Sequence, residues 1–238
     1  MDKVKELAKM IDHSILQPTY TDRDLEKQCE IALKYNVASV CVKPYAVKKA
    51  AMLLKGSTVK VGCVIGFPHG NSTTEVKVFE ANRACSDGAS EIDMVINIGK
   101  VLGGDWEYVE EEIRLVTETC HLNNAIVKVI FETDYITGEA DKIRLCEICT
   151  AAGADFVKTS TGYGFVKQAD GSYNYNGATV EDVVLMRKFS GPKVQVKCAG
   201  GVRTLDDLLR MREAGATRSG ATATAAIIDE AIKRFGKT

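Results

Sequence analysis

Two lysines each stand between a short apolar segment and a stretch that contains glycine. Lys158 follows Asp-Phe-Val and precedes Thr-Ser-Thr-Gly, and Lys197 follows Val-Gln-Val and precedes Cys-Ala-Gly-Gly-Val-Arg. An amine at the end of a β-strand, beside a glycine turn, is well placed to meet a small substrate. The two segments therefore indicate amine chemistry at one end of a β-sheet.

A lysine can attack a carbonyl group only after it has lost its proton, and its ordinary pKa of about 10.4 prevents this at neutral pH. Burial and a neighbouring cation both disfavour the charged amine, and together they lower a lysine pKa by several units. We therefore expect one reactive amine, Lys158, and one amine that tunes it, Lys197.

Asp93 and Lys128 are ionisable residues inside two further apolar segments. A buried carboxylate needs a partner, and four charged groups that converge inside one barrel are typical of an active site. For one lysine alone, a structural salt bridge is the better interpretation. For Lys128 the structural interpretation stays ahead, because no glycine turn follows it.

Short β-branched segments alternate with amphipathic ones along the whole chain. This alternation predicts an α/β protein with a single domain, residues 1–238, folded as a (β/α)8 TIM barrel with an extra N-terminal helix. The expected strands are 11–16, 38–42, 59–65, 91–95, 126–131, 155–159, 193–197 and 217–220. The expected helices are 22–35, 47–54, 74–86, 106–121, 139–152, 179–189, 205–214 and 224–235.

Residues 163–176 interrupt this pattern with a polar and aromatic stretch. They predict a long loop or a hairpin after the sixth strand. Loops at this end of a barrel contact substrates, so Tyr163, Tyr173 and Tyr175 are candidate lid residues. A surface insertion without a role in the site is an equally good interpretation.

Glycines follow three of the late strands, where βα barrels commonly bind phosphate through backbone amides and a helix N-terminus. A single glycine would be explained by the needs of a tight turn. Several glycines with a threonine nearby predict a phosphorylated substrate; these residues are Gly162, Gly200, Gly201, Gly220 and Thr222.

The composition points to a small-molecule partner. A formal net charge of -1 with interspersed acids and bases gives no indication of nucleic acid, and no segment has the length or apolar character of a membrane span or a signal peptide. Three histidines far apart in the sequence provide no paired metal ligands, so we expect no metal and no cofactor. Eight scattered cysteines favour the reducing cytoplasm, and the Cys146–Cys149 pair has a redox or metal role only as a minor alternative.

Five characteristic segments are spread over nearly the whole chain: IDHSIL (11–16), VIGFPHG (64–70), EIDMVIN (91–97), VKTSTG (157–162) and KCAGGVR (197–203). In this combination the chain resembles the deoxyribose-phosphate aldolase family of class I aldolases. The resemblance implies reversible cleavage of 2-deoxy-D-ribose 5-phosphate to D-glyceraldehyde 3-phosphate and acetaldehyde, without a cofactor.

The resemblance also implies a role for each site residue. Lys158 would form the Schiff base, Lys197 would lower its pKa, and Asp93 with a water would transfer protons. Thr161 and Cys41 would lie in the substrate cavity, and the glycines and the threonine named above would surround the phosphate. The apolar surroundings of Cys41 predict a raised thiol pKa, so we expect an accessory residue rather than a nucleophile.

Four features depart from the family pattern. Gln17 stands where many members have lysine, Ala223 replaces a small hydroxyl residue, and the segment 163–176 is longer than usual. The sequence also lacks the C-terminal tyrosine of some members, so that proton transfer is expected to depend on Asp93 and water. We expect altered phosphate affinity.

Two alternatives remain at this point. One is another Schiff-base aldolase or a transaldolase that acts on a different phosphosugar. The other is a non-catalytic barrel that binds a sugar phosphate, because a fold alone does not imply chemistry. The presence of both lysines argues against the second. For assembly, we expect a homodimer.

Overall fold

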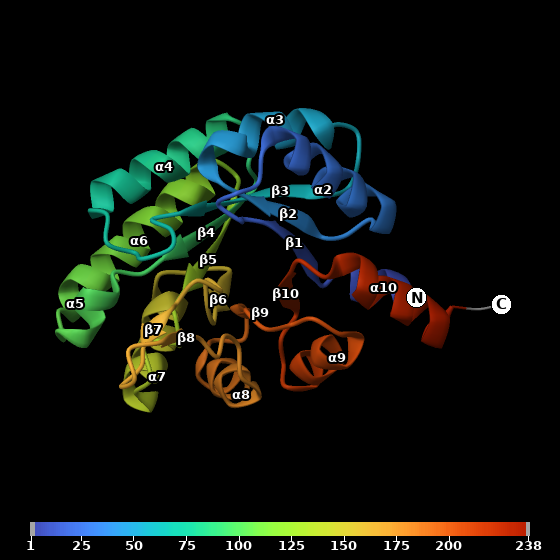
Figure 1. Ribbon diagram of the computed structural model, residues 1–238. Helices are drawn as coiled ribbons and strands as arrows, with labels where there is room; N and C mark the ends of the chain where they lie inside the picture. The colour runs from blue at the N-terminus through green and yellow to red at the C-terminus, as the bar shows by residue number, and fades with distance from the viewer. Residues whose placement is uncertain (1–2, 237–238) are drawn as a thin grey trace.

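Eight parallel strands close into a barrel in the computed structural model, which describes residues 3–236 (Figure 1). The barrel strands are β1 Ile11–Ile15, β2 Ser39–Val42, β3 Lys60–Ile65, β4 Glu91–Val95, β5 Ile126–Ile130, β6 Phe156–Lys158, β9 Gln195–Ala199 and β10 Arg218–Ala221. Around the barrel they follow the order β1, β10, β9, β6, β5, β4, β3, β2. The predicted (β/α)8 TIM barrel is confirmed; residues 1, 2, 237 and 238 of the predicted domain lie outside the described residues.

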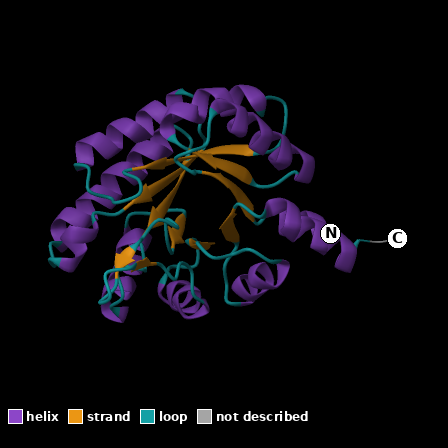
Figure 2. Cartoon of the chain, viewed as in Figure 1, coloured by secondary structure: helices purple, strands orange, loops and turns teal. Residues whose placement is uncertain are grey.

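Helices surround the barrel strands on their outer side (Figure 2). They are α1 Lys3–Ala8, α2 Asp22–Tyr35, α3 Val47–Leu53, α4 Thr74–Ser86, α5 Ile98–Leu102, α6 Trp106–Leu122, α7 Glu139–Ala151, α8 Val180–Phe189, α9 Leu205–Glu213 and α10 Thr224–Phe235. The expected extra N-terminal helix is α1. Two short elements were not predicted, the 3-10 turn Pro44–Ala46 and α5, because one or two turns carry too little periodicity to be recognised. Within residues 3–236, no helix is both long and apolar enough to cross a membrane.

Alternation along the strands separates an apolar layer beneath the helices from an interior that holds the charged residues. On β4, Ile92 and Met94 are completely buried in the hydrophobic core beneath the helices, whereas Asp93 between them lies outside that core. Each such buried apolar side chain stabilises the fold by roughly 1.5–3 kcal/mol. This outer core therefore holds the strands that carry the charged residues of the interior.

The strand register brings the two lysines together. Lys158, the last residue of β6, pairs with Lys197 of β9, and Asp93 of β4 pairs with Lys128 of β5. The seventh barrel strand was expected at 193–197 but spans Gln195–Ala199, because its pairing with β10 continues as far as Ala199. Lys197 therefore lies in the middle of its strand rather than at its end.

The segment 163–176 forms a hairpin. Its two short antiparallel strands, β7 Val166–Lys167 and β8 Tyr173–Asn174, are separate from the barrel sheet. The hairpin follows β6, so it lies at the end of the barrel where Lys158 lies.

Candidate active site

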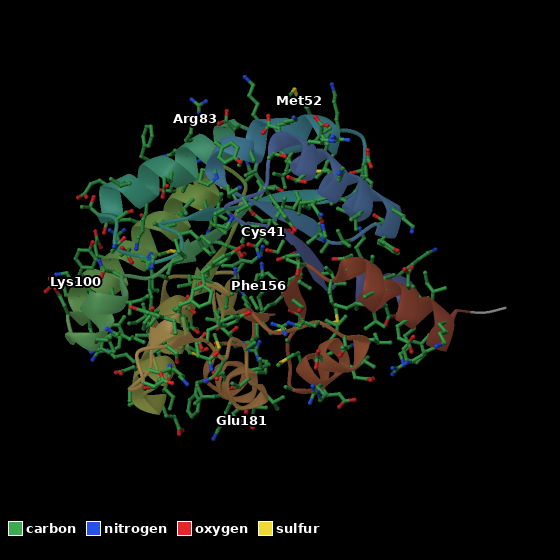
Figure 3. All side chains as sticks on the ribbon, in the orientation of Figure 1. Cys41, Met52, Arg83, Lys100, Phe156 and Glu181 are labelled. Atoms are coloured by element: carbon green, nitrogen blue, oxygen red, sulfur yellow. The ribbon has the colours of Figure 1, made fainter. Side chains whose placement is uncertain are left out.

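Seven ionisable side chains form a cluster inside the barrel, and the carboxylate of Asp93 lies at its centre. Its Oδ2 lies 2.7 Å from the Nζ atoms of both Lys158 and Lys197, and its Oδ1 lies 2.9 Å from Nζ of Lys128. The other members are Asp12, Glu91 and Arg218, from β1, β4 and β10. Figure 3 shows Cys41 and Phe156 within the barrel, and Met52, Arg83, Lys100 and Glu181 toward the outer helices.

The three lysines differ in how well their charge is balanced. Lys128 has three carboxylates within 3.2 Å, and Lys197 has two, Asp12 at 2.6 Å and Asp93 at 2.7 Å. Among the described residues, Asp93 is the one carboxylate that pairs with Lys158. With Arg218 the cluster holds four cations and three carboxylates, so full ionisation leaves one positive charge in excess. Loss of the proton from Lys158 removes that excess.

The pKa shifts of the two paired lysines have opposite directions. Burial lowers the pKa of Lys158; the charge of Lys197 lowers it further, and Asp93 opposes both only in part. Burial also disfavours the ammonium of Lys197, but Asp12 and Asp93 outweigh it and raise that pKa. Because only a neutral amine attacks a carbonyl, Lys158 is the better nucleophile of the pair.

In the absence of substrate, the surroundings favour the carboxylate form of Asp93 and the thiol form of Cys41. Burial alone would raise the pKa of Asp93, but Lys128, Lys158 and Lys197 hold it well below its usual range. Cys41 Sγ lies 4.0 Å from Asp93 Oδ2, and burial raises the pKa of this thiol to about 11. A protonated thiol is a poor nucleophile, so Cys41 contributes packing and shape to the site.

A cavity of about 310 Å³ opens at the C-terminal ends of the strands and reaches the two lysines. Asp93 does not line it and is completely buried behind them. The cavity brings together the other predicted site residues: Cys41, Lys158, Thr161, Gly162, Lys197, Gly200, Gly201, Gly220 and Thr222.

One wall of the cavity is built from backbone amides. Gly162, Gly200 and Gly201 have φ angles of 84°, 86° and 87°, a region that favours glycine. Within residues 3–236 we find no protein acceptor for their N–H groups. Helix α10 starts just beyond Thr222 without a side-chain cap, so its N-terminal amides are also available to an anion. We call this wall the glycine cradle.

Several residues of the site were not assigned a role from the sequence. Asp12 and Arg218 join the buried cluster, and Arg203 lines the cavity beside the glycine cradle. Asp12 had a usable signal, since it is a carboxylate inside a predicted strand, as Asp93 is. Lys128 is completely buried and does not line the cavity, in agreement with a structural role.

The hairpin contributes an aromatic edge to the cavity. Tyr163, Phe165 and Tyr175 line it, and the rings of Phe165 and Tyr175 meet edge to face with centroids 5.4 Å apart. Tyr173 is 62% exposed and does not line the cavity, so it is no part of this edge. The segment 163–176 therefore contacts the cavity through these three aromatic side chains.

The Cys146–Cys149 pair lies apart from this cavity on α7. Both thiols are buried, and burial raises the pKa of Cys146 to about 11 and that of Cys149 well above its usual value. Buried protonated thiols act as small apolar groups in packing.

The fold and the site define a βα barrel with a buried amine at the base of a cavity, the arrangement of a class I aldolase. The model of the DeoC/LacD aldolase family matches residues 6–228. The chain belongs to this family. Curated deoxyribose-phosphate aldolases from Rhodopirellula baltica and Thermococcus gammatolerans are each 50% identical to it, over 97% and 95% of this chain and 91% and 96% of theirs.

Solved structures agree with this assignment. A deoxyribose phosphate aldolase from Aeropyrum pernix, described as a unique tetramer, superimposes with a TM-score of 0.85 at 28% identity. The match covers 97% of this chain and 92% of that one. An aldolase described as QR15 gives a TM-score of 0.86 at 37% identity, over 96% and 97% of the two chains.

Proposed function

We infer that this protein has deoxyribose-phosphate aldolase activity and takes part in the breakdown of deoxyribose phosphate. It cleaves 2-deoxy-D-ribose 5-phosphate reversibly to D-glyceraldehyde 3-phosphate and acetaldehyde. The observation that carries the assignment of the nucleophile is the unequal pairing of the lysines. Lys158 faces one carboxylate and Lys197 faces two, so the surplus proton leaves Lys158.

In this mechanism the neutral amine of Lys158 attacks C1 of the open-chain sugar, and the carbinolamine loses water to give a protonated imine. The imine accepts the electron pair of the C2–C3 bond when the C3 hydroxyl loses its proton, and glyceraldehyde 3-phosphate leaves. The remaining enamine takes a proton at C2, and water hydrolyses the imine to release acetaldehyde. Asp93, Lys197 and a water carry these protons.

The glycine cradle accounts for the choice of a phosphorylated sugar. Its free amides and the N-terminus of α10 offer donors to phosphate oxygens, and Arg203 adds a full positive charge at the rim. The amine and the cradle lie in one cavity. A sugar bound through its phosphate is therefore held with its carbonyl end toward Lys158.

Reductive trapping tests the function and the nucleophile together. The protein is incubated with 2-deoxyribose 5-phosphate and sodium borohydride, then digested, and the peptides are examined by mass spectrometry. We expect one reduced adduct on the peptide that carries Lys158. An adduct on Lys197 alone would contradict the assignment of the nucleophile. No adduct, where a known class I aldolase is trapped, would contradict the activity, and product analysis separates it from a transaldolase.

Replacement of Arg203 tests the phosphate rim. We expect Arg203→Ala to raise KM for the phosphorylated sugar about tenfold, with kcat little changed, because one hydrogen bond to a charged group is lost. Steady-state kinetics measure the effect. Arg210→Ala is the matched control, since Arg210 is an exposed arginine of α9 that pairs with Asp207 and does not line the cavity. Equal effects of the two substitutions would contradict a role for Arg203.

Location and assembly follow as further parts of this proposal. Eight free cysteines, seven of them buried, suit the cytoplasm, because thiols persist in a reducing compartment. Exposed apolar side chains on α3 and α4, such as Met52 and Phe79, suit a self-association surface, and we propose a homodimer. Light scattering of the purified protein measures the assembly directly; a monomer at micromolar concentration would contradict it.

A further inference from the structure

Glu132 is a completely buried carboxylate that the mechanism above does not use, and it lies beneath one edge of the glycine cradle. It follows β5 by two residues and has a φ angle of 55°, in the left-handed region that disfavours residues other than glycine. Burial raises its pKa to about 7. A strained, desolvated carboxylate persists only where its surroundings hold it, and such residues cluster at functional sites.

The contacts of Glu132 shape the first turn after Lys158. The Thr161 hydroxyl donates to Oε2 of Glu132, and the Thr161 N–H lies 3.3 Å from both carboxylate oxygens. The Tyr163 N–H in turn donates to Thr161 Oγ1 at 2.9 Å. Both amides that flank Gly162 are thus tied to the carboxylate. Within the described residues, the Gly162 N–H between them has no protein acceptor.

A second carboxylate in the segment that follows β5, that of Asp134, holds the other end of the hairpin. Asp134 accepts the N–H of Asn176 at 2.6 Å and that of Gly177 at 3.1 Å. Gly177 packs directly on Gly200, since a Cβ at Gly177 would lie 2.7 Å from the carbonyl carbon of Gly200. The segment after β5 therefore fixes both ends of the loop that forms one side of the glycine cradle.

We propose that Glu132 is a positioning residue for phosphate recognition, which holds the turn at Thr161 and Tyr163 so that the Gly162 amide meets the phosphate of the substrate. The inference rests on the proposed function. Within residues 3–236, Glu132 forms no hydrogen bond or ion pair with Lys158, although the charge of Lys158 lowers the pKa of Glu132, and Glu132 does not line the cavity. The direct effect of its loss is therefore on the binding of the phosphate group, because its hydrogen bonds go to the turn and not to the amine.

The test compares substrates with and without the phosphate group. For Glu132→Ala and Glu132→Asp we expect KM for 2-deoxyribose 5-phosphate to rise about tenfold at unchanged kcat, because alanine removes the acceptor of the turn and the shorter aspartate draws the carboxylate away from it. kcat/KM for unphosphorylated 2-deoxyribose should stay within about twofold, by the same reasoning. Glu132→Gln keeps a carbonyl acceptor in place of Oε2 and should retain most of the preference of the unmodified protein for the phosphorylated sugar. The aspartate and glutamine variants keep the test valid if the alanine variant does not fold.

Glu80 provides a matched control. Its carboxylate accepts the N–H of Gly66 at 2.8 Å, at the end of β3 and outside the cavity, so Glu80→Ala should leave the phosphate preference unchanged. Equal losses with both sugars in the Glu132 variants, or no change with either, would overturn the proposal. Failure of the proposed function is separately visible, because the unmodified protein would then form no borohydride adduct with acetaldehyde.

Discussion

Lys158→Ala should abolish cleavage of 2-deoxyribose 5-phosphate while the barrel remains folded. The rate is expected to fall by a factor on the order of 10⁵, since the covalent intermediate cannot form. Lys197 cannot replace the missing amine, because Asp12 and Asp93 raise its pKa and keep it protonated. The measurements are the cleavage rate, the borohydride adduct and the thermal unfolding temperature.

The charge count explains why this variant should fold. Lys158 is the surplus cation of the cluster, and Asp93 keeps Lys128 at 2.9 Å and Lys197 at 2.7 Å. Lys77→Ala is the matched control, because Lys77 is a buried lysine on α4 whose partner, Glu112 at 2.6 Å, lies outside the site. That control should lose more stability and retain its turnover chemistry. Substantial activity in Lys158→Ala would disprove the role of Lys158.

Lys197→Leu should slow turnover at neutral pH and shift its pH dependence. Without the adjacent cation the pKa of Lys158 rises, so less of this amine is neutral at pH 7. Since the reactive form is the deprotonated one, kcat/KM increases with pH through the pKa of Lys158. We expect this rising limb to move to higher pH by about one unit or more. At pH 7 we expect kcat/KM to fall roughly 100- to 1,000-fold, because proton transfer is also lost.

The pH dependence of kcat/KM separates this effect from simple damage to the fold. Lys77→Leu removes another buried, paired lysine and should lower the unfolding temperature without moving the rising limb. A Lys197→Leu variant with an unshifted limb would show that Lys197 does not tune Lys158. Partial recovery of its activity at alkaline pH would support the electrostatic explanation.

The strand pattern of the sequence was sufficient for the fold, because β-branched runs and amphipathic segments have distinct periods. It failed where signals were short or depended on pairing. Helix α5 has only five residues, and the seventh strand extends to Ala199 because β10 pairs with it. No local sequence pattern identifies Glu132 as a site residue, because its surroundings depend on the distant turn at Thr161.

The sequence by itself determined the order of residue types along the strands: two lysines shortly before glycine turns and an aspartate within an apolar strand. These local features were enough to predict a βα barrel with amine chemistry and a phosphate site. Only the tertiary structure decided how the charges are shared. Asp12 lies far from Lys197 in the chain, yet the closed barrel brings their charged atoms within 2.6 Å. Because interactions between buried charges depend on distance and desolvation, the difference between the two lysines exists only in the folded protein.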